Sequence, residues 1–242
     1  MELYWGVQPV LDMLREGRPL ERIVVVRGRH GPRLREIVER ARAANVPIRQ
    51  EGREALDRLA AGGVHQGVAA WAAPFAYASR AAILDGMSSP GLVAVFDGVQ
   101  DPHNLGALLR TAAASGCDGV FLPERRAVGL TAAVLKASAG TAARVPIARE
   151  ASMTGLLRGL RDSGVWCVAV EAGAPPPWSG FDFSLPVALV LGGEGAGLRP
   201  GLRSLCEAAV GLPLVRGVES LNVSVAFGAV AYEVVRQRSQ GR

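Results

Sequence analysis

The chain has 242 residues, of which 49% are hydrophobic, and it contains 30 Gly and 15 Pro. This composition is typical of one large or two small compact domains and excludes a disordered protein. No apolar run approaches the roughly 18 residues that a membrane-spanning helix needs. The start, MELYWGVQPV, lacks the basic residues and the apolar core of a signal peptide.

The basic residues are almost all arginines. The formal net charge is +5, and Lys136 is the only lysine among 27 basic residues. Arginine suits bidentate phosphate recognition, but genomic base composition explains the same excess. Residues 1–75 hold 12 Arg and 9 acidic residues and so carry +3 of the total. This mildly basic segment permits a nucleic-acid partner.

The cysteines and histidines predict no metal site. Cys117, Cys167 and Cys206 lie in apolar segments without CxxC spacing, so we expect buried thiols in a reducing compartment, by default the cytoplasm. His65 lies just before a strand, where a hydrogen bond in a turn is its expected role, and no histidine has metal-ligand spacing.

Residues 1–75 predict a small α/β unit of alternating helices and strands. In chain order the segments are a helix, a strand, a helix, a short extended piece, a helix and a strand: PVLDMLREG, ERIVVVRG, RLREIVERARAAN, VPIRQ, REALDRLAA and VAAWAA. Arg27, Arg29, Arg33 and Arg35 gather where the first strand meets the second helix. They either bind phosphate or form a solvated surface.

Residues 76–89 contain a short helix-like AAILDGM and end on Ser-Ser, directly before Pro90, and we predict a linker there. From residue 90 onward, apolar strands alternate with helices up to the C-terminus. Strands that are apolar throughout and are separated by helices predict a parallel sheet with both faces covered. The chain therefore divides into a domain over 1–75, a linker over 76–89 and a larger α/β domain over 90–242.

Three loops after strands of the larger domain carry polar residues that a core does not need. In the first, DGVQDPHNLGALLRTA, Asn104 is placed to cap a helix that begins near Leu105. Arg110 lies further along this apolar helix, where it either points outward or is held in a site.

The second and third loops belong to the C-terminal stretch Pro186–Val235, which we interpret as a cofactor pocket. In LGGEGAGLRP, the glycines permit close backbone approaches, and Glu194 must face solvent or a ligand. The pattern is not GxGxxG, and a dinucleotide loop would follow the first strand of its sheet, so that interpretation is excluded. In the third loop, Ser220 or Asn222 caps the final helix, and the presence of both indicates a ligand.

Three blocks in these loops carry a family resemblance. NLGALLRTA, LVLGGEGAGLRP and LPLVRGVESLNVSVAFGAVAYE resemble, in order and spacing, the three motifs of the SpoU (TrmH) family of SPOUT-superfamily RNA 2′-O-ribose methyltransferases. This resemblance covers residues 91–238. The opening GVQPVLDML and the HQGV element resemble the L30e-like substrate-binding domain of the 23S rRNA guanosine subgroup.

The resemblance implies a parallel-sheet SPOUT domain with a C-terminal trefoil knot, preceded by a small L30e-like α/β domain. It implies S-adenosylmethionine as cofactor and a homodimer with the final helix and the first-motif helix at its interface. The residues that match the adenosyl contacts are Gly192, Gly193, Leu212 and Leu221. The residues that match the catalytic polar positions are Arg110, Asn104, Glu194, Ser220 and Asn222.

The implied reaction is methyl transfer to the ribose 2′-hydroxyl of a guanosine in 23S rRNA. Arg110 matches the group that activates the hydroxyl, either as a base or by stabilising its developing negative charge. A guanidinium with a pKa above about 12 scarcely deprotonates, which favours the second role. The alternatives are a tRNA substrate, an rRNA site of antibiotic resistance, or a non-catalytic RNA-binding or ribosome-assembly protein on the same scaffold.

Overall fold

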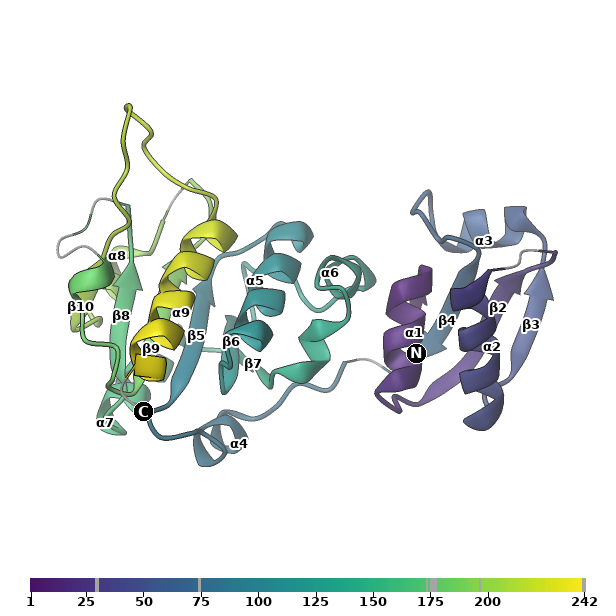
Figure 1. The fold of residues 1–242 in the computed structure, drawn as a ribbon, viewed down its shortest axis with the longest axis horizontal. Helices are drawn as coiled ribbons and strands as arrows, with labels where there is room; N and C mark the ends of the chain where they lie inside the picture. Colours follow the sequence, from purple (N-terminus) through teal and green to yellow (C-terminus); the bar gives the residue numbers. More distant parts are fainter. Residues whose placement is uncertain (29–30, 74, 173, 175–177, 196, 241–242) are drawn as a thin grey trace. The chain divides into compact units, whose positions relative to one another are not determined.

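The computed structural model describes residues 1–28, 31–73, 75–172, 174, 178–195 and 197–240 (Figure 1). Arg29 of the predicted arginine group lies outside these residues. The chain folds into two compact units. The first comprises Met1–Ala76 and Leu130–Ala143, and the second comprises Tyr77–Gly129 and Arg144–Arg242. Among the described residues, no helix is both long and apolar enough to cross a bilayer.

The first unit is built on a mixed four-stranded sheet in the order β1-β4-β2-β3. Its strands are β1 (Glu2–Trp5), β2 (Leu20–Val26), β3 (Ile48–Glu51) and β4 (Val68–Ala72). Its helices are α1 (Val7–Arg15), α2 (Pro32–Ala43), α3 (Arg53–Leu59) and α6 (Ala132–Ala137). β2 pairs in parallel with β3 and antiparallel with β4, and β1 adds an antiparallel edge that the sequence did not predict.

One buried histidine holds the entry to β4 in the first unit. His65 is 5% exposed, and its Nδ1 accepts a hydrogen bond from Gly67 N at 3.0 Å. Its Nε2 lies 2.8 Å from Asp57 Oδ1. These bonds agree with the turn role expected from the sequence.

The second unit contains the predicted parallel sheet, with six strands in the order β10-β8-β9-β5-β6-β7. All neighbouring strands pair in parallel. The strands are β5 (Leu92–Asp97), β6 (Gly119–Pro123), β7 (Ile147–Glu150), β8 (Trp166–Val170), β9 (Val187–Gly192) and β10 (Ala208–Val210). The helices are α4 (Arg80–Asp85), α5 (Pro102–Ala114), α7 (Met153–Asp162), α8 (Pro200–Arg203) and α9 (Val223–Gln240). Short 3-10 turns lie at Thr141–Arg144, which ends in this unit, and Trp178–Gly180.

Helices cover both faces of this sheet, which explains why its strands are apolar throughout. In Figure 1, α5 and α9 (yellow) lie side by side across one face. On that face, the rings of Phe96 and Phe227 meet edge to face with centroids 5.0 Å apart. Alternate residues of β5, Val93 and Val95, join a buried cluster on the other face with leucines of α7 such as Leu157.

The segment 76–89, for which the sequence predicts a linker, contains α4. Ile83 of this helix is 1% exposed and packs into the same cluster as α7. Ser79 caps the helix, since its side chain accepts a hydrogen bond from Ala82 N at 3.1 Å.

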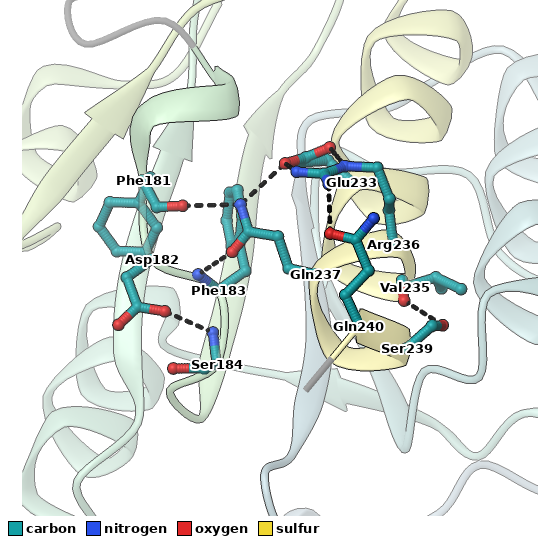
Figure 2. Close-up of polar contacts among 10 residues, drawn as sticks. All are labelled: Phe181, Asp182, Phe183, Ser184, Glu233, Val235, Arg236, Gln237, Ser239 and Gln240. Carbon is teal, nitrogen blue, oxygen red and sulfur yellow. Dashed lines mark hydrogen bonds and ion pairs between the residues drawn. The ribbon is translucent and has the colours of Figure 1, made fainter. Parts of the chain in front are cut away.

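The last turns of α9 are fixed to the segment before β9 by side-chain hydrogen bonds. Figure 2 shows Gln237 accepting from Phe183 N at 2.8 Å and donating to Phe181 O at 3.0 Å. Gln237 also donates to Glu233, which is 3% exposed and is bound by Arg236 through both carboxylate oxygens at 2.7 Å. The hydrogen bond from Arg236 holds the pKa of Glu233 below its usual range. α9 is therefore anchored at its C-terminal end, away from the loop that begins it.

Arg238 completes this anchor. Its guanidinium donates to four backbone oxygens at 2.9–3.0 Å, those of Pro90, Gly91, Phe183 and Leu185. Burial lowers the pKa of this arginine.

Candidate active site

The glycine loop after β9 folds back on itself at the carboxyl edge of the sheet. β5 and β9 are neighbours and end opposite each other, with Asp97 paired to Gly192. Gly193 and Gly197 form an isolated antiparallel β-bridge, in which Gly197 N donates a hydrogen bond to Gly193 O at 3.1 Å. A Cβ on Gly192 would lie 2.0 Å from the backbone of Gly197, and one on Gly193 would lie 2.3 Å from Gly98 O. The loop can close in this way only without side chains at these positions.

An ion pair between the buried Asp97 and the exposed Arg199 fixes the base of the loop. Asp97, at the end of β5, is 5% exposed and accepts two hydrogen bonds from Arg199, at 2.6 and 2.8 Å. The bond to Asp97 raises the pKa of Arg199. Because these residues lie 102 positions apart, the pair ties the first motif loop to the second.

The cap of α5 is Asp101, not Asn104 as the sequence predicted. The Asp101 carboxylate accepts from His103 N at 3.1 Å and Asn104 N at 3.3 Å, and Pro102 is the first helical residue. Asp at the cap position followed by Pro at the first helical position is a strong helix-start signal, so the pair Asp101-Pro102 predicts this cap. This shift places Asn104 within the first turn and leaves its side chain available for other partners.

Asn104 joins Glu194 and Asn222 in one polar cluster. Asn104 is 9% exposed and donates from Nδ2 to Glu194 Oε1. Asn222 Nδ2 donates to Asn104 Oδ1 at 2.9 Å and to Glu194 Oε1 at 3.2 Å. Three of the predicted catalytic residues, one from each loop, therefore meet at the edge of the sheet.

Asn222 is also the cap of α9, which decides between the two caps considered from the sequence. Its Oδ1 accepts from Ser224 N at 2.9 Å and from Ser224 Oγ at 2.6 Å. Ser220 is exposed and lines the adjoining cavity. Asn222 therefore has two roles, at the start of the helix and in the polar cluster.

A cavity of about 750 Å³ lies between the glycine loop, the end of β8 and the segment that leads into α9. All four residues predicted to contact the adenosyl group line it: Gly192, Gly193, Leu212 and Leu221. Glu194, Ser220 and Asn222 line it as well. Further apolar walls come from Leu191, Leu198, Leu214, Val223 and Ala226. Glu171 also lines it and is bound by Arg203 at 2.7 Å.

A second cavity of about 440 Å³ lies on the other side of Glu194. It shares Gly193, Glu194 and Gly197 with the first cavity. Its remaining lining residues are Asp97, Gly98, Val99, Gln100, Asp101, Asn104, Arg126 and Arg199. The polar cluster therefore separates two neighbouring cavities.

Arg110 is not part of the cluster. It is exposed on α5 and lines neither cavity. The buried residues of this helix include Leu105, Leu108, Leu109 and Ala112, and an apolar stripe with that spacing places residue 110 on the opposite side. The arginine faces outward, the first of the two possibilities that the sequence left open.

Several polar residues at the site were not singled out from the sequence. They are Asp97, Arg199, Arg126 and Glu171. An Asp at the carboxyl end of an otherwise apolar buried strand is a signal that could have found Asp97. No local pattern marks its partner.

The cysteines are buried and free, as predicted. Burial raises the pKa of each of the three thiols to about 12. Within the part of the chain that the structure describes, no group of three or more His, Cys, Asp or Glu side chains is placed to hold a metal ion.

Comparison with known families decides what this site is. The SpoU rRNA Methylase family profile matches residues 91–232, and the profile for RNA 2′-O ribose methyltransferase substrate binding matches residues 3–78. The chain belongs to the SpoU rRNA methylase family. The resemblance seen in the three motifs and in the N-terminal segment is thereby confirmed.

Curated relatives and solved structures agree with this membership. A protein of Mycobacterium ulcerans named "Uncharacterized tRNA/rRNA methyltransferase" is 40% identical over 98% of this chain and 77% of the relative. The SpoU methyltransferase AviRb from Streptomyces viridochromogenes, solved with AdoMet, has 25% identity and a TM-score of 0.82 over 99% of this chain and 91% of that one. A structure described as RNA 2′-O ribose methyltransferase has 27% identity and a TM-score of 0.80, and covers 98% of this chain and 88% of that one. The SpoU-family parallel α/β fold is therefore shown.

Proposed function

We propose that this SpoU-family enzyme transfers the methyl group of S-adenosylmethionine to the ribose 2′-hydroxyl of a guanosine in 23S rRNA. One observation carries the proposal: all four predicted adenosyl contacts line one cavity beside the Asn104–Glu194–Asn222 cluster. Domain 1–75 binds the RNA in this proposal, segment 76–89 links it, and domain 90–242 carries out the transfer.

The larger cavity suits the cofactor in size and chemistry. Its volume of about 750 Å³ falls within the usual range for small-molecule sites. Leucines such as Leu198, Leu212 and Leu214 offer apolar surface to an adenine, and the glycine loop offers backbone N–H and C=O groups. The carboxylates of Glu171 and Glu194 match the positive charges of S-adenosylmethionine. The bound cofactor supplies an electrophilic methyl group on a sulfonium.

Asn104, Glu194 and Asn222 position the acceptor ribose in this proposal. The Glu194 carboxylate is held by two amide donors, so its orientation is set before substrate arrives. A carboxylate fixed in this way can accept a hydrogen bond from a hydroxyl at the boundary of the two cavities, and Ser220 adds a further hydroxyl on the cofactor side. Such preorganisation lowers the cost of aligning a nucleophile.

Arg110 stabilises the negative charge that develops on the 2′-oxygen. Because its side chain faces outward from α5, it reaches the acceptor of a second copy of the chain when α5 and α9 form the interface of a homodimer. The exposed fractions of Val225 and Tyr232 on α9, 55% and 52%, support an interface on this helix. A guanidinium remains charged at neutral pH, which suits electrostatic stabilisation better than proton removal.

We also propose that the C-terminal segment forms a trefoil knot. The close approach of Gly193 to Gly98, where a Cβ would lie 2.3 Å from the Gly98 carbonyl oxygen, supports it. So does Gly211, where a Cβ would lie 2.5 Å from the backbone of Ala174. In both contacts, the C-terminal segment lies directly against backbone from an earlier part of the chain.

The test is transfer of a labelled methyl group to total RNA from a strain that lacks the activity, followed by mapping of the modified nucleotide. We expect a 2′-O-methylguanosine in 23S rRNA. The Gly192→Ala variant controls for contaminating methyltransferases. Label on tRNA alone would support the tRNA alternative, which the relatives' names also include. No labelling, with no binding of S-adenosylmethionine by calorimetry, would support the non-catalytic alternative. A cytoplasmic location is part of the proposal and rests on the three buried thiols.

A further inference from the structure

The second cavity contains an arginine that neither the motifs nor the cofactor account for. Arg126 lines it from the loop after β6, and its side chain is exposed. Val128 N in the same loop donates to Val99 O at 3.0 Å, which ties this loop to the one that precedes α5. Arg126 has a φ of +65°, a conformation that a non-glycine residue adopts at a cost. The loop therefore holds the arginine at the rim of the cavity.

The carboxylates around the cavity are already engaged. Asp97 is bound by Arg199 through both oxygens. Asp101 accepts from the first turn of α5, and Glu194 accepts from two side-chain amides. Among the described residues, none forms an ion pair with Arg126. Of the two arginines that line this cavity, Arg199 is paired with Asp97, so Arg126 is the one available to bind an anionic ligand.

We propose that the second cavity is the subsite for the acceptor nucleotide and that Arg126 binds the RNA phosphate next to the target ribose. This inference rests on the proposed function. The two cavities share Glu194, Gly193 and Gly197, so a ribose in the second cavity faces the methyl donor in the first across the polar cluster. Its 2′-hydroxyl then lies toward Asn104 and Glu194, and the adjoining phosphodiester lies toward the guanidinium. A planar guanidinium is well suited to bind two phosphate oxygens at once.

The neighbouring residue provides a matched control. Arg125 is also exposed and lies in the same loop, but it does not line the cavity. Asparagine removes the cation at either position and tolerates a positive φ better than most residues, so Arg126→Asn retains the loop conformation. Arg126→Lys keeps a positive charge but loses the bidentate geometry.

Methyl transfer to 23S rRNA transcribed in vitro, with labelled S-adenosylmethionine, tests the assignment. We expect Arg126→Asn to lower kcat/KM for this RNA by roughly 10- to 100-fold, the effect of one lost charge-assisted hydrogen-bonding group. Arg126→Lys recovers part of the loss, and Arg125→Asn stays within about twofold of the wild type. The Kd of S-adenosylmethionine, measured by calorimetry, is unchanged in all three variants. Equal losses in Arg125→Asn and Arg126→Asn would overturn the subsite, as would a loss of cofactor affinity in Arg126→Asn.

Filter binding of the same RNA separates this inference from the proposed function. We expect Arg126→Asn to reduce the slope of log K against log salt by roughly 0.7–0.9, the value of one phosphate contact, and Arg125→Asn to leave it unchanged. If the wild-type protein binds this RNA but transfers no methyl group, the proposed function is refuted. The salt slopes of the wild type and Arg126→Asn still test whether Arg126 binds a phosphate. An active wild type with an unchanged slope and unchanged kcat/KM in Arg126→Asn refutes the inference alone.

Discussion

Replacing Gly192 with alanine tests whether the folded-back glycine loop builds the cofactor cavity. The new Cβ would lie 2.0 Å from the C and O atoms of Gly197 and 2.2 Å from Leu198 N. These are backbone atoms that cannot rotate away, so the loop must move by more than about 1 Å to restore normal contact distances. Overpacking typically costs about 1–3 kcal/mol. We expect a destabilisation of about 3 kcal/mol, the upper end, because no flexible side chain can absorb the strain.

The displaced segment, from Gly192 to Leu198, lines the larger cavity. We therefore expect the Kd of S-adenosylmethionine, measured by isothermal titration calorimetry, to rise at least tenfold. That rise corresponds to about 1.4 kcal/mol. The free energy of unfolding is measured in parallel by urea denaturation, so that loss of binding in a folded protein is distinguished from loss of the fold.

Two other glycines serve as controls. A Cβ on Gly201, in α8, would meet nothing within 4 Å, and its φ is not in the left-handed region. Gly201→Ala is expected to be neutral or to stabilise by about 0.5–1 kcal/mol. Gly195 also has open space but a φ of +76°, so Gly195→Ala isolates backbone strain, at about 1 kcal/mol. Wild-type cofactor affinity and stability in Gly192→Ala would refute the close packing of the folded-back glycine loop.

Four further outcomes are expected. Arg110→Ala should lower kcat by about 10²–10³-fold and leave the urea midpoint unchanged, since the side chain is exposed. A loss of stability would contradict the outward position of this side chain. The pH–rate profile of Arg110→Lys tests the charge-stabilising role. Asn104→Asp places a carboxylate beside Glu194, so activity should fall at pH 8 and partly return near pH 5 as the pair takes up a proton; a pH-independent loss would contradict this. Arg199→Ala leaves the buried Asp97 unpaired. Because the Arg199 side chain is 49% exposed, we expect the free energy of unfolding, measured by urea denaturation, to fall by only about 1–2 kcal/mol. The loss should be smaller in the double variant that also carries Asp97→Asn. Arg236 lowers the pKa of Glu233, so the ion pair stabilises the fold above the unfolded pKa of about 4.3, and this stabilisation is lost as pH falls through the lowered value. Glu233→Gln should therefore make the free energy of unfolding fall less steeply below about pH 5. An unchanged pH profile would contradict the role of this pair.

Most of the larger unit could be predicted because its strands are buried on both faces. Continuous apolar runs such as LVAVFD and PVALVL, separated by helices, admit few other folds. β1 was missed because ELYW is short, and its partner β4 begins at Val68, far along the chain. α8 has four residues and was too short to leave a periodic pattern.

The site was predicted unevenly, and capping explains the difference. Asn222 proved to be a cap, whereas Asp101 took the role expected of Asn104. Both Asp and Asn favour the cap position, so propensity alone did not choose between them, although Pro102 at the first helical position did favour Asp101. With Asp101 as the cap, Asn104 lies in the first turn of α5, where its side-chain amide contacts Glu194 and Asn222.

The contacts that make the site are invisible to local patterns because they join distant residues. Asn104 and Glu194 lie 90 positions apart, and Asn104 and Asn222 lie 118 apart. The strand order, once known, nevertheless dictates where they meet. From β5 the chain proceeds outward to β6 and β7, and then crosses to β8 and β9 on the other side of β5.

Such a reversal leaves a crevice at the carboxyl ends of the two strands between which the order changes. Here those strands are β5 and β9, which end at Asp97 and Gly192. Both cavities open at this edge, and both are lined by Gly193, Glu194 and Gly197, which follow β9 directly. The position of the site is therefore a consequence of topology, and the three motif loops supply its chemistry because each follows a strand, β5, β9 or β10, to the same edge of the sheet.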